Sequence, residues 1–475
     1  MERYRLFIDG AWQESPEVKP IRSPYDGSVV GEVCFAEKEQ VEEAIGAAHK
    51  AFSATRQLAS FERSRALDQV ASEISRRRED FARSITLQAG KPIRDARVEV
   101  DRAANTFQIA AEEARRFGGE IIPLDLIAAA RNRWGLTRRF PLGPIAAISP
   151  FNFPLNLVAH KVAPAMAAGN TIVLKPSSQV PITALLLADA IGRTDYPRGG
   201  FNALPAGYRE AEPLLDDDRV KMLTFTGSPA IGWELKKRAN KKKVTLELGG
   251  NAAVVVEPDA DLEFAVPRIT TGSFSYAGQI CISIQRIYVQ ANIYDRFMAD
   301  FLERTKKLRL GDPLDEATDV GPMISEAAAR QVEERIGQAA AEGGRVLCGG
   351  TRKGQMVEPA ILENVKPELP LSRLEAFAPV VVVNPYKEFE AALEAVNDSL
   401  YGLQAGVFTG DLNKAFQAFE TLEVGGVVLN DIPTFRVDHM PYGGVKESGF
   451  GREGVRYAME EMSELRLLAL NLKGR

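Results

Sequence analysis

Two segments of the chain place one chemically reactive side chain among apolar neighbours. The segment 278–283 (GQICIS) contains Cys281, and 246–250 (LELGG) contains Glu247 at the end of an apolar run. A cysteine thiolate is a strong nucleophile, and a carboxyl group in apolar surroundings has a raised pKa that suits a general base. Each residue also has a structural interpretation. Cys281 equally fits the role of a small core residue, and Glu247 that of a strand-end residue facing water.

Two further segments suit a cofactor that carries phosphate groups. The segment 224–228 (TFTGS) follows an expected strand and leads into a helix, so Gly227 permits a tight turn and free helix amides can contact a pyrophosphate. Lys175 ends the apolar segment TIVLK, at the edge of a parallel sheet where ligands gather. The structural alternatives are a serine that only caps the helix and a lysine that only reaches solvent.

Another glycine-rich segment matches the dinucleotide fingerprint GxGxxG but lacks the complete strand–helix–strand unit that normally surrounds this motif. The segment 449–454 (GFGREG) follows no clear strand, and only 21 residues remain after it. That length is too short to complete a strand–helix–strand unit with its distal acidic residue. We interpret these glycines as turn residues.

Composition and charge exclude several classes of function. A chain of 475 residues is too long for one hydrophobic core, and its net charge of −5 gives no reason to expect a nucleic-acid partner. The uncharged stretch 140–160 contains four prolines, which argues against a membrane span. The three cysteines form no CxxC pair and the three histidines no HExxH motif, so we expect no bound metal. Without a signal sequence, and with a cysteine as the candidate nucleophile, a cytoplasmic protein is expected.

The elements expected along the chain indicate an α/β protein with doubly wound parallel sheets. A hairpin turns at Asp9-Gly10, a helical pattern covers 38–117, and 124–141 is predicted to be a strand pair projecting from the body. Strands and helices then alternate, with strands at 144–149, 171–175, 222–225 and 244–248 and helices at 182–191 and from 229. A second series begins near residue 251, with strands at 251–257, 287–289, 380–383 and 427–429. The apolar strand 465–472 either pairs with another subunit or packs on its own body.

These segments, taken together, resemble the aldehyde dehydrogenase superfamily. Three more segments carry the same resemblance: 149–155 (SPFNFPL), 375–379 (EAFAP) and 441–449 (PYGGVKESG). All of these motifs occur in the family's order and with its spacing, over nearly the whole chain. The resemblance implies a Rossmann-like cofactor domain (1–123 and 142–250) and an α/β catalytic domain (251–446). It also implies an oligomerisation arm at 124–141, a C-terminal strand at 462–475, and a homodimer or homotetramer.

The resemblance also implies a role for each matched residue. Cys281 attacks the aldehyde carbon, the side-chain amide of Asn152 and the backbone amide of Cys281 hold the oxyanion, and Glu247 activates the water that hydrolyses the thioester. The implied cofactor is NAD or NADP. It would be bound by Ser149, Phe151, Lys175, Ser178, Gly207, Gly227, Ser228, Glu375 and Phe377. Ser178 stands where members that prefer NAD commonly have a glutamate, so the electrostatic obstacle to NADP is missing.

The substrate is less defined than the chemistry. The segments 153–156 and 430–439 are similar to the lactaldehyde dehydrogenase-like branch, which acts on small hydroxylated or anionic aldehydes. Arg102 and Arg436 are candidate partners for a substrate anion, with a structural salt bridge as the alternative for each. A semialdehyde or phosphorylated-aldehyde dehydrogenase is the rival with the same chemistry. The base Glu247 disfavours a CoA-acylating enzyme, and the intact Cys281, Asn152 and Glu247 disfavour a non-catalytic relative.

Overall fold

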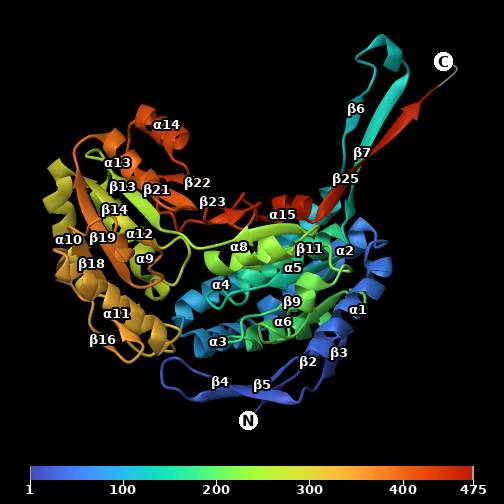
Figure 1. Cartoon of the computed structure of the whole chain (residues 1–475), viewed down its shortest axis with the longest axis horizontal. Coiled ribbons are helices and arrows are strands. Elements are labelled where there is room, and N and C mark those ends of the chain that lie inside the picture. The colour runs from blue at the N-terminus through green and yellow to red at the C-terminus, as the bar shows by residue number, and fades with distance from the viewer. Residues whose placement is uncertain (1, 473–475) are drawn as a thin grey trace.

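The first sheet has five parallel strands at its centre, as the alternation of strands and helices predicts (Figure 1). The computed structural model describes residues 2–472. Short antiparallel strands flank the centre on both sides. The order is β24-β12-β11-β8-β9-β10-β2-β3, formed by β2 (Leu6–Ile8), β3 (Ala11–Gln13), β8 (Pro144–Ile148), β9 (Thr171–Lys175), β10 (Phe201–Ala203), β11 (Met222–Thr226), β12 (Lys243–Glu247) and β24 (Gly449–Phe450).

Helices cover both faces of this sheet, which is why its strands are apolar throughout. Val41 and Leu235 belong to the layer on one face, while Phe107 and Val158 belong to the layer on the other. The helices of this body are α1 (Lys38–Thr55), α2 (Ser60–Arg76), α3 (Arg78–Ala89), α4 (Ile93–Arg116), α5 (Asn156–Ala168), α6 (Ile182–Gly192), α7 (Pro213–Asp216) and α8 (Pro229–Arg238). A small sheet of β1 (Arg3–Tyr4), β5 (Val29–Phe35) and β4 (Glu17–Arg22) completes it.

The second sheet has seven strands, of which all but the edge strand β15 run parallel. Its order is β15 (Arg345–Cys348), β18 (Ala360–Glu363), β19 (Val380–Tyr386), β14 (Ile284–Gln290), β13 (Ala252–Val256), β21 (Gln404–Phe408) and β22 (Gly426–Leu429). Its helices are α9 (Leu262–Phe274), α10 (Tyr294–Lys306), α11 (Glu326–Ala341), α12 (Pro370–Arg373), α13 (Phe389–Asn397) and α14 (Leu412–Thr421). The two sheets confirm the predicted α/β fold class.

Two short strand pairs and three single-turn 3-10 helices join these elements. They are β16 (Arg352–Lys353) with β17 (Met356–Val357), β20 (Tyr401–Gly402) with β23 (Val445–Lys446), and η1 (Ala128–Ala130), η2 (Ser275–Gly278) and η3 (Ala291–Ile293). Over residues 2–472, no helix is both long and apolar enough to cross a membrane.

A long three-stranded arm projects from the first body (Figure 1). It consists of β6 (Ile121–Pro123), β7 (Arg133–Pro141) and β25 (Ser463–Asn471), and β25 pairs with β7 over its full length. The arm therefore starts before the expected 124–141, because β6 pairs with β7 and 124–132 forms the tip between them. The last part of the expected C-terminal strand, 473–475, lies outside the described residues.

Before it enters the arm, the chain returns from the second body to the first. β24 pairs with the edge strand β12, and α15 (Val455–Glu461) packs against α5 and α4. Gly451 and Gly454 between them have φ values of 81° and 93°. These left-handed conformations agree with the interpretation of the GxGxxG match as a turn.

One buried side chain fixes the base of the arm. The Asn170 side-chain oxygen accepts hydrogen bonds from the amides of Leu142 (2.8 Å) and Gly143 (3.1 Å), and its nitrogen donates to the Met462 carbonyl oxygen at 2.9 Å. Leu142 follows β7 and Met462 precedes β25. Both long strands of the arm therefore leave the body at a position that Asn170 defines.

Candidate active site

The loop before β14 holds Cys281 in a strained conformation. Tyr276, Ala277 and Gly278 have consecutive φ values of 50°, 51° and 66°. A left-handed conformation costs an L-residue about 1–2 kcal/mol, so packing must compensate for two of them. At Gly278 a Cβ atom would clash with the Ala378 carbonyl, within the EAFAP segment. This close approach fixes the turn that presents the half-buried Cys281.

The Cys281 thiol is hydrogen-bonded to a phenol that the sequence did not single out. Its Sγ lies 3.2 Å from the Tyr442 hydroxyl, and the Arg436 guanidinium lies 3.6 Å from the centroid of the Tyr442 ring. Burial raises the pKa of Cys281 to about 12, and the hydrogen bond from Tyr442 acts in the opposite direction. Burial therefore favours the neutral thiol, whereas the hydrogen bond from Tyr442 favours the thiolate.

Glu247 ends β12 with its carboxylate buried and both of its oxygens unpaired within the part of the chain that the structure describes. Burial, and then the negative charge of Glu453, raise its pKa well above the usual value. A carboxyl group of raised pKa is a stronger base when ionised than an exposed glutamate. The two glycines that follow it also touch the site. A Cβ atom at Gly250 would clash with the Cys281 carbonyl oxygen, and one at Gly249 with the Glu375 carboxylate.

Asn152 lies in the loop between β8 and α5 and contacts the loop that carries Cys281. Its buried side-chain nitrogen donates to the Gln279 carbonyl oxygen at 3.0 Å. An amide nitrogen carries two hydrogens, so one remains for a second acceptor. The loop that carries Asn152 and the loop that carries Cys281 are thus joined by a direct hydrogen bond.

A buried ion pair supports the Asn152 loop from behind. The Lys91 ammonium group pairs with Glu99 and lies 3.6 Å from the centroid of the Phe153 ring. The other Glu99 oxygen accepts hydrogen bonds from the backbone amides of Leu155 (2.9 Å) and Asn156 (3.1 Å). The carboxylate therefore satisfies free amides at the start of α5. This pair could not be predicted from local sequence, because Lys91 lies between a glycine and a proline.

A buried group of charges lies behind Glu247 and Tyr442. Glu453 accepts from Lys161 at 3.0 Å and from Arg436 at 3.2 Å, and all three side chains are almost fully buried. Burial opposes the ionisation of Glu453, but the two cations outweigh it and lower its pKa to about 2. Neither Lys161 nor Glu453 was predicted from the sequence. The available signal was a lone lysine inside the apolar helix α5.

Arg102 and Arg436 each form a salt bridge with a carboxylate, which was the structural alternative considered for both arginines. Arg102 pairs with Asp438 at 2.7 Å, and Asp438 also lies 2.9 Å from His160 and 3.3 Å from the Asn156 amide. The Arg436 side chain is only 6% exposed, whereas Arg102 is 27% exposed. Of the two, Arg102 has the more exposed side chain.

The expected cofactor residues line the carboxyl ends of the parallel strands of the first sheet. Ser149 follows β8, Lys175 ends β9, and Gly227 and Ser228 follow β11. The Ser149 hydroxyl is buried and, over residues 2–472, without a hydrogen-bond partner, as is that of Thr226. Burial lowers the pKa of Lys175, and no carboxylate of the described chain pairs with it. This edge thus has polar groups that fit the hydroxyl and phosphate groups of a dinucleotide.

The remaining cofactor candidates fall into two groups. Phe151 and Phe377 meet edge to face with ring centroids 5.8 Å apart, and Glu375 accepts the Gly250 amide at 2.9 Å. Burial raises the pKa of Glu375 to about 7. At the other end, the exposed Ser178 donates to the Ala206 carbonyl oxygen at 3.3 Å, and the adjacent Gly207 is covered by the Glu210 carboxylate. The two groups lie beside the nucleophile and beside Lys175, respectively.

The pKa of Cys281 leads to a test without any substrate. Its alkylation by iodoacetamide, followed by mass spectrometry of the Cys281 peptide, should rise about tenfold per pH unit from pH 7 to 9, because only the thiolate reacts. Tyr442→Phe should slow alkylation at each pH, whereas Tyr288→Phe, which alters a remote phenol, should not. A rate that levels off below pH 8, or an unchanged rate in Tyr442→Phe, would contradict this description.

The chain is similar to known proteins over nearly its whole length. The model of the aldehyde dehydrogenase family matches residues 12–468. A 3-sulfolactaldehyde dehydrogenase of Priestia aryabhattai is 45% identical over 99% of both chains. A lactaldehyde dehydrogenase of Methanocaldococcus jannaschii is 42% identical over 98% of this chain and 100% of that protein.

Solved structures agree over the whole fold. Aldehyde dehydrogenase 21 from Physcomitrella patens, in complex with the reaction product succinate, has a TM-score of 0.98 and 45% identity, covering 100% of this chain and 99% of that one. The glyceraldehyde-3-phosphate dehydrogenase of Methanocaldococcus jannaschii, complexed with NADP, has a TM-score of 0.91 and 41% identity, covering 95% and 99%. The chain therefore belongs to the aldehyde dehydrogenase family and is an NAD(P)-dependent aldehyde dehydrogenase.

Proposed function

We propose that this enzyme oxidises a short polar aldehyde to its carboxylic acid through a thioester on Cys281, which water hydrolyses with Glu247 as the base. The observation that carries the proposal is the convergence of Cys281, Asn152 and Glu247 on one buried site. The first body would bind NAD or NADP, and the second would supply the nucleophile. The lack of a carboxylate at Ser178 favours the use of NADP as well as NAD.

In the first half of the reaction, the Cys281 thiol releases its proton to solvent, and the thiolate sulfur forms a bond to the aldehyde carbon. The oxyanion that develops is held by the free side-chain N–H of Asn152 and the backbone N–H of Cys281. A single such donor typically lowers the barrier by about 3 kcal/mol. NAD or NADP, held by Lys175, Gly227, Ser228 and Glu375, would supply the acceptor for the hydride of this carbon. Cys281 is then left as a thioester.

In the second half, Glu247 takes a proton from water, which attacks the thioester carbon. The carbon–sulfur bond breaks, the acid leaves, and the proton held by Glu247 passes to the departing sulfur, which restores the Cys281 thiol. The raised pKa of Glu247 suits this step, because it makes the ionised carboxylate a better proton acceptor. A thiol acceptor such as CoA would not require a base in this position, which disfavours an acylating enzyme.

We expect the Glu247→Gln variant to separate the two halves of the reaction. Mixed rapidly with aldehyde and cofactor, it should give a burst of about one reduced cofactor per chain and then turn over slowly, because the thioester accumulates. Cys281→Ala should give no burst. Steady turnover of Glu247→Gln without a burst would contradict the assignment of Glu247 as the hydrolytic base.

For the substrate, we propose a short aldehyde with a hydroxyl or an anionic group. The similar proteins are named for sulfolactaldehyde, lactaldehyde and glyceraldehyde 3-phosphate, and one was solved with succinate. Arg102 is the better candidate for the anion, because it is partly exposed and Asp438 links it to Asn156 beside the oxyanion loop. Arg436 forms an ion pair with Glu453 and lies against the ring of Tyr442, so we expect it to position these two side chains and not to bind the substrate. A semialdehyde or a phosphorylated aldehyde remains the alternative within this class.

Arg102→Gln tests the site of the substrate anion. We expect the KM for succinic semialdehyde to rise about tenfold or more while the KM for lactaldehyde changes little, because only the anion loses a guanidinium partner. Arg102→Lys should show an intermediate effect, since lysine keeps the positive charge but cannot form the bidentate hydrogen bonds of a guanidinium group. Arg94→Gln, on the same helix with an exposed partner, is the control. Equal changes for both aldehydes would exclude Arg102 as the anion partner.

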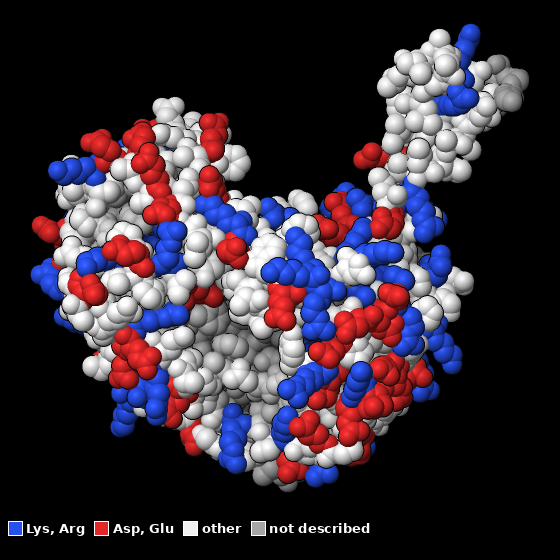
Figure 2. All heavy atoms as spheres, in the orientation of Figure 1, with Lys and Arg blue, Asp and Glu red and all other residues white. Residues whose placement is uncertain are grey.

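We propose that the arm assembles the enzyme into a homodimer or homotetramer. The arm projects from the body in Figure 2, and few charged side chains lie on the face of the arm that is visible there. It exposes apolar side chains at Ile121, Leu126, Ile127, Trp134, Leu465, Leu467 and Leu468. Such a patch is costly in water and is typical of a subunit interface. The need for a free thiol at Cys281 favours a reducing, cytoplasmic setting.

A further inference from the structure

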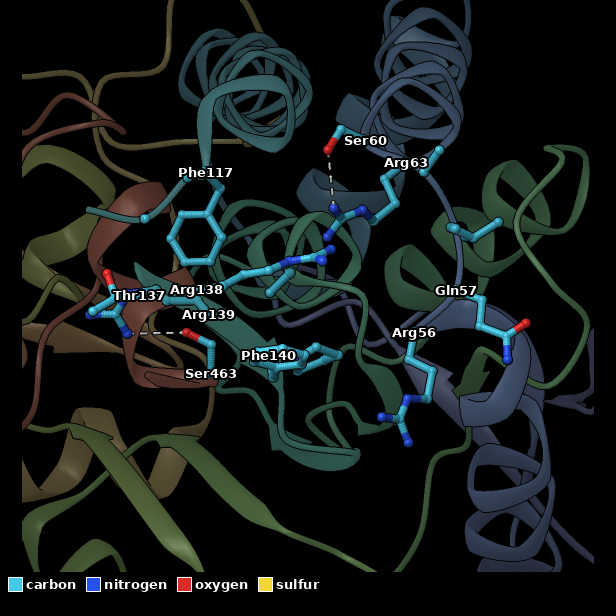
Figure 3. Close-up of a pocket in the computed structure, with 16 residues that line it drawn as sticks. Arg56, Gln57, Ser60, Arg63, Phe117, Thr137, Arg138, Arg139, Phe140 and Ser463 are labelled. Atoms are coloured by element: carbon cyan, nitrogen blue, oxygen red, sulfur yellow. Dashed lines mark hydrogen bonds between the residues drawn. The ribbon is translucent and has the colours of Figure 1, made fainter. Parts of the chain in front are cut away.

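A large cavity lies at the base of the arm, away from the catalytic residues (Figure 3). It measures about 710 Å³ and lies between the α1–α2 loop, the start of α2, the residues after α4, and β7. Its wall includes Pro141, which precedes β8, and Ala168, which precedes β9. It therefore adjoins the amino ends of the parallel strands, at the edge of the sheet opposite to the cofactor residues.

Four arginines line this cavity, and no aspartate or glutamate does. They are Arg56, Arg63, Arg138 and Arg139. None of them has a carboxylate within salt-bridge distance over residues 2–472, although most of the other arginines of the chain form such pairs. The cavity thus concentrates positive charge that the described chain leaves uncompensated.

The polar contacts of these arginines go to neutral groups. Arg63 donates to the Ala167 carbonyl at 2.7 Å and to the Ser60 hydroxyl at 3.3 Å, while its buried Nε lacks a partner in the described chain. Arg139 donates to the Glu460 backbone carbonyl at 3.1 Å and to the Ser463 hydroxyl at 3.2 Å. Arg63 and Arg139 are thereby held in place while they keep their full charge.

The other two arginines of the group are Arg56 and Arg138. Both are exposed, and each lies near an aromatic ring, Arg56 at 5.4 Å from Phe52 and Arg138 at 5.5 Å from Phe140. Figure 3 shows the Arg138 guanidinium pointing toward Arg63. Burial, and in smaller part the charge of Arg138, lower the pKa of Arg63. Two guanidinium groups that face each other without a counter-ion form a site that an anion would stabilise.

We propose that this cavity binds a small polyanion, a metabolite with at least two negative charges on phosphate or carboxylate groups. A guanidinium group can donate two parallel hydrogen bonds to two oxygens of a phosphate or a carboxylate group. The four positive charges of the cavity exceed the single negative charge of one carboxylate, so a ligand with several negative charges fits better. The volume accommodates a ligand larger than a single inorganic ion. The ligand would contact both α2 and β7, so that it would connect the body to the arm. This proposal is independent of the catalytic assignment.

The test is calorimetric titration of the intact enzyme, saturated with NADP to block the cofactor site, with inorganic pyrophosphate and in parallel with citrate. The pocket variant is Arg56→Gln/Arg138→Gln, which removes two side chains without hydrogen-bond partners in the described chain. The control variant is Arg83→Gln/Arg296→Gln, which removes the same charge from exposed arginines elsewhere. Light scattering on each protein reports whether the oligomeric state is unchanged.

We expect saturable binding of at least one probe at one site per chain, with Kd about tenfold or more higher in the pocket variant and unchanged in the control. Preference for pyrophosphate or for citrate then identifies the chemical group that is recognised. No saturable binding in the parent enzyme would overturn the proposal. An equal loss in both variants would also overturn it, since it would indicate surface charge alone. So would a pocket variant that loses its oligomeric state with no change in anion binding, since the arginines would then serve subunit contacts.

Discussion

The carboxylate of Glu453 holds two buried cations, Lys161 and Arg436, directly behind the reactive groups. Lys161 comes from a helix of the first body and Arg436 from a loop that follows the second sheet. A buried charge is costly unless it is paired, so separating these elements would leave Glu453 and its cations uncompensated. The negative charge of Glu453 contributes to the raised pKa of Glu247, and Arg436 lies against the ring of Tyr442, which contacts Cys281. Both halves of the proposed reaction therefore depend on this ion pair network.

Much of the framework follows from patterns that are local in the sequence. The apolar run TIVLK coincides with β9, and the alternation of strands and helices led to the correct fold class. The arm was less well predicted, because β6 has three residues and is stabilised by pairing rather than by its own composition. The candidate residues Cys281, Glu247 and Asn152 came from motifs, whereas the contacts that join their segments, such as that of Asn152 with Gln279, required the structure.

The groups that tune the site were not accessible to sequence reasoning. Tyr442 contacts a cysteine 161 positions earlier, and Glu453 pairs with a lysine 292 positions earlier. Pairing over such distances leaves no periodic signal. The same holds for Arg102 and Arg436, whose carboxylate partners decide how much of each guanidinium is free. It also holds for the arginine-lined cavity, where the informative feature is that the described chain places no counter-charge around four arginines from the loop after α1, from α2 and from β7.

The central claim is that the substrate carbon becomes attached to Cys281. The most direct measurement is peptide mass spectrometry of the Glu247→Gln enzyme, quenched in acid within one turnover after mixing with NADP and lactaldehyde. The proposed mechanism predicts an added acyl group on the Cys281 peptide that hydroxylamine removes, with the Cys34 and Cys348 peptides unmodified. Reduced cofactor without any acyl group on Cys281, or an acyl group on another cysteine, would contradict the mechanism.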